Sequence, residues 1–301
     1  MSDARITSEP PIVPSDPIES IDPEVAGLYG PTSEAWVLNR EAMLLLGAGP
    51  RALLLQLAHP SVAAGVAEHS DFRADPWARL DATLRSYLRI VYGTRTAAHA
   101  EIARLNALHG TITGATYRAR DPELSLWVHA TLVDSTIVAA DRWLEPLSRE
   151  RRARYYAETL PIGRAFGIPA RLLPADLDAF ELYVAGALGP GGPVRVGSLA
   201  RELADVVLHP PLGPVAPMLG DLPAWSYAWT LWPSIGLLPP TVRNGYGLRW
   251  GVHERLVAGW LVAAWRIWRP ILPAGFRQMP QALAADRRID RAGRSSGGRR
   301  P

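Results

Sequence analysis

The stretch that decides the fold is DPELSLWVHATLVDSTIVAADRWL, residues 121–144. Its Asp-Pro-Glu opening is typical of a helix start, with Asp121 as the N-cap and Pro122 at the first helical position. From there to Asp134, apolar side chains fall on nearly every face of the predicted helix. A helix with that pattern is buried on all sides. We therefore expect a long central helix with the rest of the chain packed around it.

The segments on either side of this stretch are also helical in pattern, and alternating β patterns are nearly absent. Further helices are expected at 33–46, 51–59, 75–93, 96–114, 147–167, 174–188 and about 252–268. The first of these is expected to break at the run GAGP, residues 47–50, because glycine and proline disfavour a helix interior. The prediction is an all-α fold with one main domain. Its expected parts are an extended, proline-rich arm at 1–31, a helical domain at 32–283 and a disordered arginine-rich tail at 284–301.

Cysteine and lysine are both absent, so all 32 basic residues are arginines. Without thiols the chain has no disulfides, no cysteine-ligated zinc or iron–sulfur cluster and no cysteine nucleophile. Without lysine it has no Schiff-base chemistry, no anchor for pyridoxal phosphate and no P-loop. These exclusions leave histidine as the main candidate for metal chemistry.

The net charge of +3 conceals a gradient along the chain. Residues 1–24 hold six acids against one arginine, which gives −5, whereas residues 287–301 hold six arginines against one aspartate, which gives +5. No predicted folded stretch concentrates positive charge, so nucleic acid is not an expected partner. The acidic start lacks an apolar leader, and the longest apolar run, 256–265, is shorter than the ~20 residues of a membrane span. The sequence predicts a cytoplasmic protein without a signal peptide or a transmembrane helix.

Tryptophan is concentrated near the C-terminal end, with seven of the eleven within residues 225–268. Packing in the core is the favoured interpretation. A tryptophan-rich lid over an apolar pocket would give the same pattern. So would an interfacial surface that docks, together with the arginine tail, on an anionic membrane.

Two histidines, His109 and His129, lie on the core-facing side of their predicted helices. A histidine in such a place is usually a hydrogen-bonded core residue. The same position also suits an axial ligand of haem iron, and the absence of cysteine excludes thiolate ligation. The apolar neighbours that define the two stripes are Ile102, Leu105 and Ile112 for the first and Leu126, Val133 and Ile137 for the second.

Arg79 and Thr83 are four residues apart on the predicted helix that follows Pro76. At 100° per residue they fall to one side of its buried stripe, so we expect them to border the core. An arginine there could bind a carboxylate such as a haem propionate. Spacing alone favours a simpler role, an ion pair with Asp75 or Asp81.

Four stretches together resemble the catalytic domain of the MpaB-type oxygenases and rubber oxygenases (latex-clearing protein). The resemblance covers roughly residues 34–275 and rests on many short matches. The stretches are LQLAHPSVAAGVAEHSDFRADPWARLDAT (55–83), RLNALHGTITG (104–114), YRARDPELSLWVHATLVDS (117–135) and LLPPTVRNGYGLRW (237–250).

The resemblance implies a helical fold around haem b, with O₂ used to cleave an isoprenoid double bond. His109, in the R-x-x-x-L-H run, matches the proximal ligand, and His129 is the alternative. Arg79 and Thr83 match an R-x-x-x-T pair near the haem, and Thr131 matches a further pocket threonine. The carboxylate base of the rubber oxygenases has no clear counterpart, since Glu68 is out of register.

A lysine precedes the threonine of that pair in the rubber oxygenases, and here the position is Ala82. We therefore expect a distal haem site without a lysine ligand. The resulting function hypothesis is a haem b-dependent oxygenase acting with O₂ on a small apolar organic substrate. The alternative is a non-catalytic helical protein that binds haem or lipid, peripheral on membranes or not.

Overall fold

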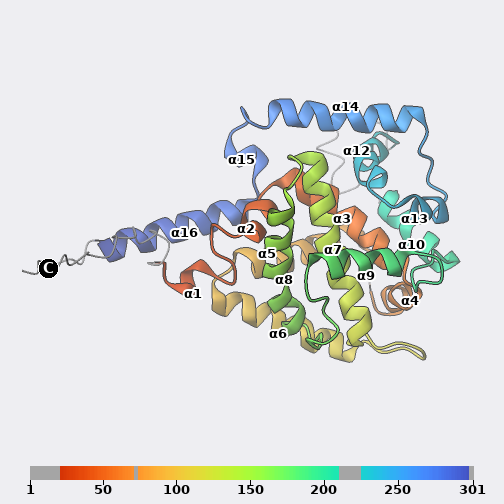
Figure 1. Cartoon of the computed structure of the whole chain (residues 1–301), viewed down its shortest axis with the longest axis horizontal. Helices are drawn as coiled ribbons and strands as arrows, with labels where there is room; N and C mark the ends of the chain where they lie inside the picture. The colour runs from red at the N-terminus through yellow and green to blue at the C-terminus, as the bar shows by residue number, and fades with distance from the viewer. Residues whose placement is uncertain (1–20, 71–73, 210–224, 298–301) are drawn as a thin grey trace, which may run out of the picture.

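The computed structural model describes the backbone of residues 21–70, 74–209 and 225–297. These residues form fifteen helices and no strand, which confirms the predicted all-α, single-domain fold (Figure 1). The helices are α1 (Pro23–Ala26), α2 (Glu34–Asn39), α3 (Ala42–Leu57), α4 (Pro60–His69), α5 (Pro76–Tyr92), α6 (Arg95–Thr111), α7 (Pro122–Trp143), α8 (Arg149–Ala165), α9 (Leu177–Leu188), α10 (Ser198–Leu208), α12 (Trp225–Gly236), α13 (Pro240–Gly245), α14 (Val252–Trp268), α15 (Ala274–Arg277) and α16 (Pro280–Gly297).

Helix α7 is the central element, as its sequence predicts. It packs against α2, α3, α8, α9 and α14, and Figure 1 shows it running through the middle of the molecule. Ala130 and Ala140 on this helix are fully buried. The side chain of Asp121 caps its first turn by accepting a hydrogen bond from the backbone N–H of Glu123 at 2.9 Å. Burial on several faces fixes α7 as the axis of the fold.

Helices α3 and α7 approach each other so closely that Gly47 is required at one contact. A Cβ atom at residue 47 would lie 2.3 Å from the indole Nε1 of Trp143. That distance is far inside van der Waals contact, so any larger residue would force the buried indole of Trp143, or the helices themselves, to move. The glycine that was expected to end a helix is instead part of a helix–helix contact.

The expected helix break at residues 47–50 is wrong. Helix α3 runs through Pro50, and the break falls earlier, at Arg40 and Glu41. Proline has no N–H to donate to the carbonyl four residues before it, here that of Leu46. The Oγ of Ser234, in α12, donates to that carbonyl at 3.2 Å. A side chain from a remote helix therefore provides the hydrogen bond that the proline cannot.

A buried polar contact connects α3, α7 and the turn before α13. Arg51 is 3% exposed, and its guanidinium forms an ion pair with Asp134 at 2.7 Å. It also donates to the Oγ of Ser135 and to the carbonyl of Leu237, both at 2.8 Å. A buried charge is tolerated when it is paired and its donors are used, and Arg51 meets this condition.

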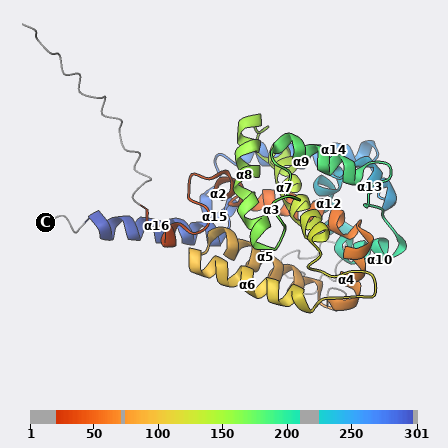
Figure 2. The same cartoon turned by 60° about the horizontal axis from the view of Figure 1, so that its bottom comes forward.

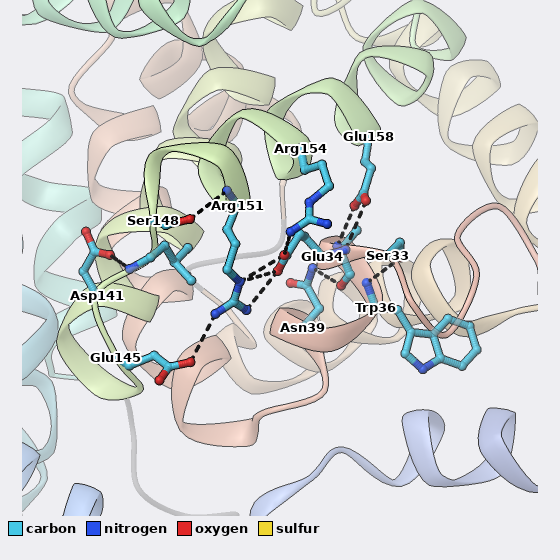
Figure 3. A network of polar contacts seen from close by, with 12 residues as sticks. Ser33, Glu34, Trp36, Asn39, Asp141, Glu145, Ser148, Arg151, Arg154 and Glu158 are labelled. Carbon is cyan, nitrogen blue, oxygen red and sulfur yellow. Dashed lines mark hydrogen bonds and ion pairs between the residues drawn. The ribbon is translucent and has the colours of Figure 1, made fainter. Parts of the chain in front are cut away.

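Helix α8 holds the N-terminus of α2 through a network of carboxylates and arginines (Figure 3). Glu158 accepts hydrogen bonds from the backbone N–H groups of Glu34 and Ala35 at 3.1 and 2.8 Å. The Glu34 carboxylate in turn accepts from Arg151 and Arg154. Burial raises the pKa of Glu158. Because the first N–H groups of a helix lack partners within it, this network completes the hydrogen bonding of α2.

The C-terminal segment also differs from expectation. In place of a disordered tail from residue 284, the described residues form α16 up to Gly297, and its end extends away from the body (Figures 1 and 2). Ala282 and Ala285 are buried against the core. Arg288 donates to the carbonyls of Val25 and Tyr92 at 3.1 and 2.9 Å. Residues 1–20, most of the expected N-terminal arm, lie outside the described residues.

None of the described helices is by itself long and apolar enough to cross a bilayer. Helices α3 and α4, bent by 100° relative to each other, meet the length and composition test only as a pair.

Candidate functional site

Helices α5 and α6 form an antiparallel pair joined at Gly93 and Thr94 (Figure 2). Arg104 on α6 donates to the Oγ of Ser86 on α5 at 3.0 Å. The side of α5 that carries Ser86 therefore faces α6. Arg79 lies two turns earlier on that side, and Thr83 lies between the two. In an antiparallel pair this places Arg79 and Thr83 opposite the C-terminal part of α6, where His109 lies.

His109 and Arg79 are close enough to interact electrostatically. The imidazole is half-buried, and burial is the largest cause of its lowered pKa. The positive charges of Arg79, Arg120 and Arg104 lower the pKa further. All these effects disfavour the protonated imidazole, so His109 is held in its neutral form. The structure thus brings together two of the residues singled out in the sequence.

Arg79 and Thr83 are exposed and do not border the core as expected. Leu80 beside them is 51% exposed, so the first turns of α5 lie open. The Oγ1 of Thr83 donates to the carbonyl of Arg79 at 2.8 Å. Both acids considered as partners of Arg79 have other roles, because Asp75 caps α5 and Asp81 pairs with Arg85. Among the described residues Arg79 forms no ion pair.

His129 lies in a closed environment on α7. Its Nε2 is buried and has no hydrogen-bond partner in the described part of the chain. A Cβ at Gly163 of α8 would lie 3.4 Å from this nitrogen. Burial lowers the pKa of His129 to about 4, so this imidazole is also neutral at ordinary pH.

Thr131 is buried at the contact between α3 and α7. Its hydroxyl accepts from the Nε2 of Gln56 at 3.0 Å and donates to the carbonyl of Val128 at 2.7 Å. Within the described ranges, no hydrogen bond or ion pair connects Thr131 or His129 to the group formed by His109, Arg79 and Thr83. The predicted site residues therefore divide into one group between α5 and α6 and a second group on α7.

Three polar residues near these groups were not identified from the sequence. Arg104 and Arg120 lie near His109, and Gln56 holds Thr131. Gln56 did carry a signal, because a single amide in the apolar run LLLQLA indicates a buried hydrogen bond.

Glu68, the out-of-register carboxylate, accepts a hydrogen bond from the hydroxyl of Tyr117 at 2.7 Å. No group of three acidic or histidine side chains in the described residues is placed to hold a metal ion.

An apolar cavity of about 290 Å³ lies at the other end of α7. It opens between α3, α7, α12 and α14, and tryptophans of the C-terminal cluster form part of its wall. A helix rises 1.5 Å per residue, so Trp143 at the cavity is ~21 Å along α7 from His129. Neither His129 nor His109 lines this cavity. Its lining residues are Met43, Trp143, Pro233, Leu261, Ala264, Trp265 and Trp268.

Comparison with known proteins identifies the family to which this chain is similar. Residues 35–267 match the family described as ER-bound oxygenase mpaB/B′/Rubber oxygenase, catalytic domain. The chain is also similar to the uncharacterized proteins Rv2237 of Mycobacterium tuberculosis and Mb2261 of Mycobacterium bovis. It is 25% identical to each over 234 residues, which cover 73% of this chain and 87% of the relative. No solved structure matches the chain.

The matched region extends from α2 to the last turn of α14 and includes α5, α6 and α7, which carry Arg79, His109 and Thr131, respectively. A single family match therefore covers more than half of the chain. It confirms the family resemblance that was inferred from the short motifs. The protein belongs to the MpaB/rubber oxygenase catalytic-domain family, a family of oxygenases.

Proposed function

We propose that the protein is a haem b-dependent oxygenase that acts with O₂ on a small apolar organic substrate. The observation that carries this proposal is the placement of His109, a neutral and half-buried imidazole opposite Arg79 across the α5–α6 pair. A neutral imidazole is the form that ligates haem iron. Bound haem would supply the iron that activates O₂.

The arginines around His109 fit the two propionates of haem. Arg79 and Arg120 both act on the imidazole electrostatically, and neither forms an ion pair among the described residues. Arg104 is already engaged by Glu101. A guanidinium binds a carboxylate through a fork of two parallel hydrogen bonds. Arg79 and Arg120 would each hold one propionate and so orient the cofactor.

The packing of the two histidines favours His109 over His129 as the ligand. A ligating nitrogen needs open space in front of it for the macrocycle, and the Nε2 of His129 is shut in by α8 at Gly163. His109 borders the open first turns of α5. We therefore assign His109 as the iron ligand and His129 as a neutral residue whose Nε2 is enclosed between α7 and α8.

The two threonines would have different roles. Thr83 lies exposed beside Arg79, so it is available to line the site on the α5 side. Thr131 is buried and its hydroxyl already forms two hydrogen bonds, so its role is to position α3 against α7. Ala82 precedes Thr83, and the chain has no lysine. The chain would accordingly offer no lysine ammonium to a bound haem.

The decisive experiment is reconstitution of the purified full chain with haem, followed by absorption spectroscopy. We expect a Soret band of a histidine-ligated haem that His109→Ala removes and His129→Ala keeps. No Soret band, or a band unaffected by His109→Ala, would refute the haem assignment. Substrate-dependent O₂ consumption by the haem-loaded protein tests the oxygenase activity separately. A haem-binding protein that consumes no O₂ with any apolar substrate would instead be the non-catalytic binder.

A further inference from the structure

The outer face of α14 is an exposed apolar stripe. Val252, Leu256, Trp260 and Ile267 are each between 64% and 70% exposed. At 100° per residue these four side chains fall within about 80° of one another around the helix. Helix α14 lies along one edge of the molecule with α12 beneath it (Figure 1). A contiguous apolar surface of this kind marks an interaction site.

Arginines border this stripe along one side. Arg266 lies about 80° and Arg255 about 100° from the middle of the stripe, on the same side, and both are exposed. The guanidinium of Arg142, from α7, lies beside them, since it would be 3.9 Å from a Cβ at Gly259. Neither Arg142 nor Arg255 forms an ion pair among the described residues. The charge of this edge is thus available to a partner.

We infer that the outer face of α14 docks on an anionic lipid bilayer. An apolar helix face that carries tryptophan and has cations along its margin is the pattern of a helix that lies in the plane of a membrane interface. Leu256, Trp260 and Ile267 would enter the boundary between headgroups and acyl chains. Arg142, Arg255 and Arg266 would lie at the level of the phosphates, where each cation adds electrostatic attraction.

The positive charge of Arg142, Arg255 and Arg266 argues against a second copy of the chain as the partner that covers the α14 stripe. A two-fold axis that pairs two α14 helices in antiparallel fashion keeps like edges on the same side. In a pairing centred on Trp260, Arg255 of one copy would lie beside Arg266 of the other. Like charges at such close range disfavour association, whereas anionic headgroups neutralise them.

The apolar cavity described above lies under the same helix. Leu261, Ala264, Trp265 and Trp268 of α14 line it from one side. At 100° per residue these four residues lie on the face of α14 opposite the stripe, so docking through the stripe leaves the cavity on the protein side of the helix. The docking itself requires no haem and no turnover, so it is tested independently of the proposed oxygenase activity.

The absence of cysteine allows a direct test with single-site labels on the full chain. Leu256→Cys places the only thiol on the stripe, and Leu182→Cys, at a 75% exposed position on α9, is the matched control. Each is labelled with an environment-sensitive dye and mixed with vesicles of phosphatidylcholine, with or without phosphatidylglycerol. We expect a blue shift and a rise in emission for the label at 256 with the anionic vesicles, and no change for the label at 182.

Vesicle co-sedimentation of unlabelled variants gives the second measurement. Replacing both Leu256 and Trp260 with serine should weaken binding at least ~tenfold, and Arg255→Gln should weaken it ~fivefold in a salt-sensitive way. Leu182→Ser and Arg171→Gln, at exposed sites on other elements, should leave binding unchanged. Failure to bind anionic vesicles would overturn the inference. So would a dimer in light scattering that Leu256→Ser dissociates while vesicle binding persists.

Discussion

A Cβ atom at residue 163 would lie 3.4 Å from the Nε2 of His129, so this imidazole closes against the backbone of α8. The same Cβ would lie 3.1 Å from Leu173. This contact distinguishes His129 from His109, the two histidines that the sequence left as alternative haem ligands. His129 fills a gap between α7 and α8, whereas His109 borders the open start of α5.

The first prediction concerns Gly163→Ala. The added methyl group meets Leu173 and His129. We expect Gly163→Ala to be ~1 kcal/mol less stable than Gly186→Ala, because overpacking offsets the gain in helix propensity that alanine brings at both positions. The Soret band of the haem-loaded variant should stay unchanged, because its ligand is His109. Gly186→Ala, where nothing lies within 4 Å, is the control and should not destabilise the protein. A shifted Soret band in Gly163→Ala would instead implicate His129 as a ligand.

The second prediction is a pH dependence of stability set by His129. Its pKa is about 4 in the folded protein and 6.5 without burial, so between these values the unfolded chain binds more protons. Stability is therefore complete above pH 6.5 and decreases as the pH falls toward 4, by ~3 kcal/mol in total. Urea unfolding across this range measures the slope.

His129→Leu should remove most of that slope, because no proton then distinguishes the folded from the unfolded chain at this position. His109, whose pKa is also lowered, contributes a slope of the same sign. An equal slope in wild type and His129→Leu would contradict the assignment.

The third prediction concerns the Arg51–Asp134 ion pair. Asp134→Leu leaves the guanidinium of Arg51 buried without its counter-charge, and we expect a loss of ~3 kcal/mol. Adding Arg51→Met to that variant removes the uncompensated charge and should recover most of the loss. Chemical denaturation of the two single variants and the double variant gives the coupling energy. Additive single effects would show that the pair does not act as a unit.

The fourth prediction tests the hydrogen bond between Ser234 and the Leu46 carbonyl. Ser234→Ala leaves that carbonyl without its partner and should reduce the free energy of unfolding by ~1 kcal/mol. In a Pro50→Ala background the restored backbone N–H can donate to Leu46, so the same serine substitution should have a smaller effect. A serine effect of equal size in both backgrounds would show that the proline is not the reason for the bond.

Much of the helical framework could be predicted from local sequence. The all-round apolar pattern after Asp121 predicted the central helix, and the Asp-Pro pairs marked two helix starts that the structure confirms. The break at Pro50 was wrong because the compensating donor, Ser234, is 188 residues away in the chain. The C-terminal helix was missed because the arginines dominate the composition, whereas Ala282 and Ala285 decide the packing.

The candidate site was predictable only in part, for a related reason. Periodicity put His109 on the core-facing side of its helix and Arg79 beside a buried stripe, and the family motifs put both near a haem. The structure brings the two residues within electrostatic range of each other. Periodicity does not tell whether a third element covers that side, so the exposure of Arg79 could not be read from it. The enclosure of His129 depends on Gly163, a residue without a side chain and therefore without any polar or apolar signal of its own.

The hydrogen bonds of α3 to distant segments have a consequence for the time course of folding. Its residues Leu46, Arg51 and Leu54 are bonded to partners 186 to 192 residues later in the chain. At synthesis rates of ~5–20 residues per second, those partners emerge from the ribosome ~10–40 s after α3. During that interval the largely apolar helix α3 is exposed, because the segments that pack over it have not yet been synthesised. We therefore expect the nascent protein to depend on chaperones that shield apolar segments until the C-terminal third has been made.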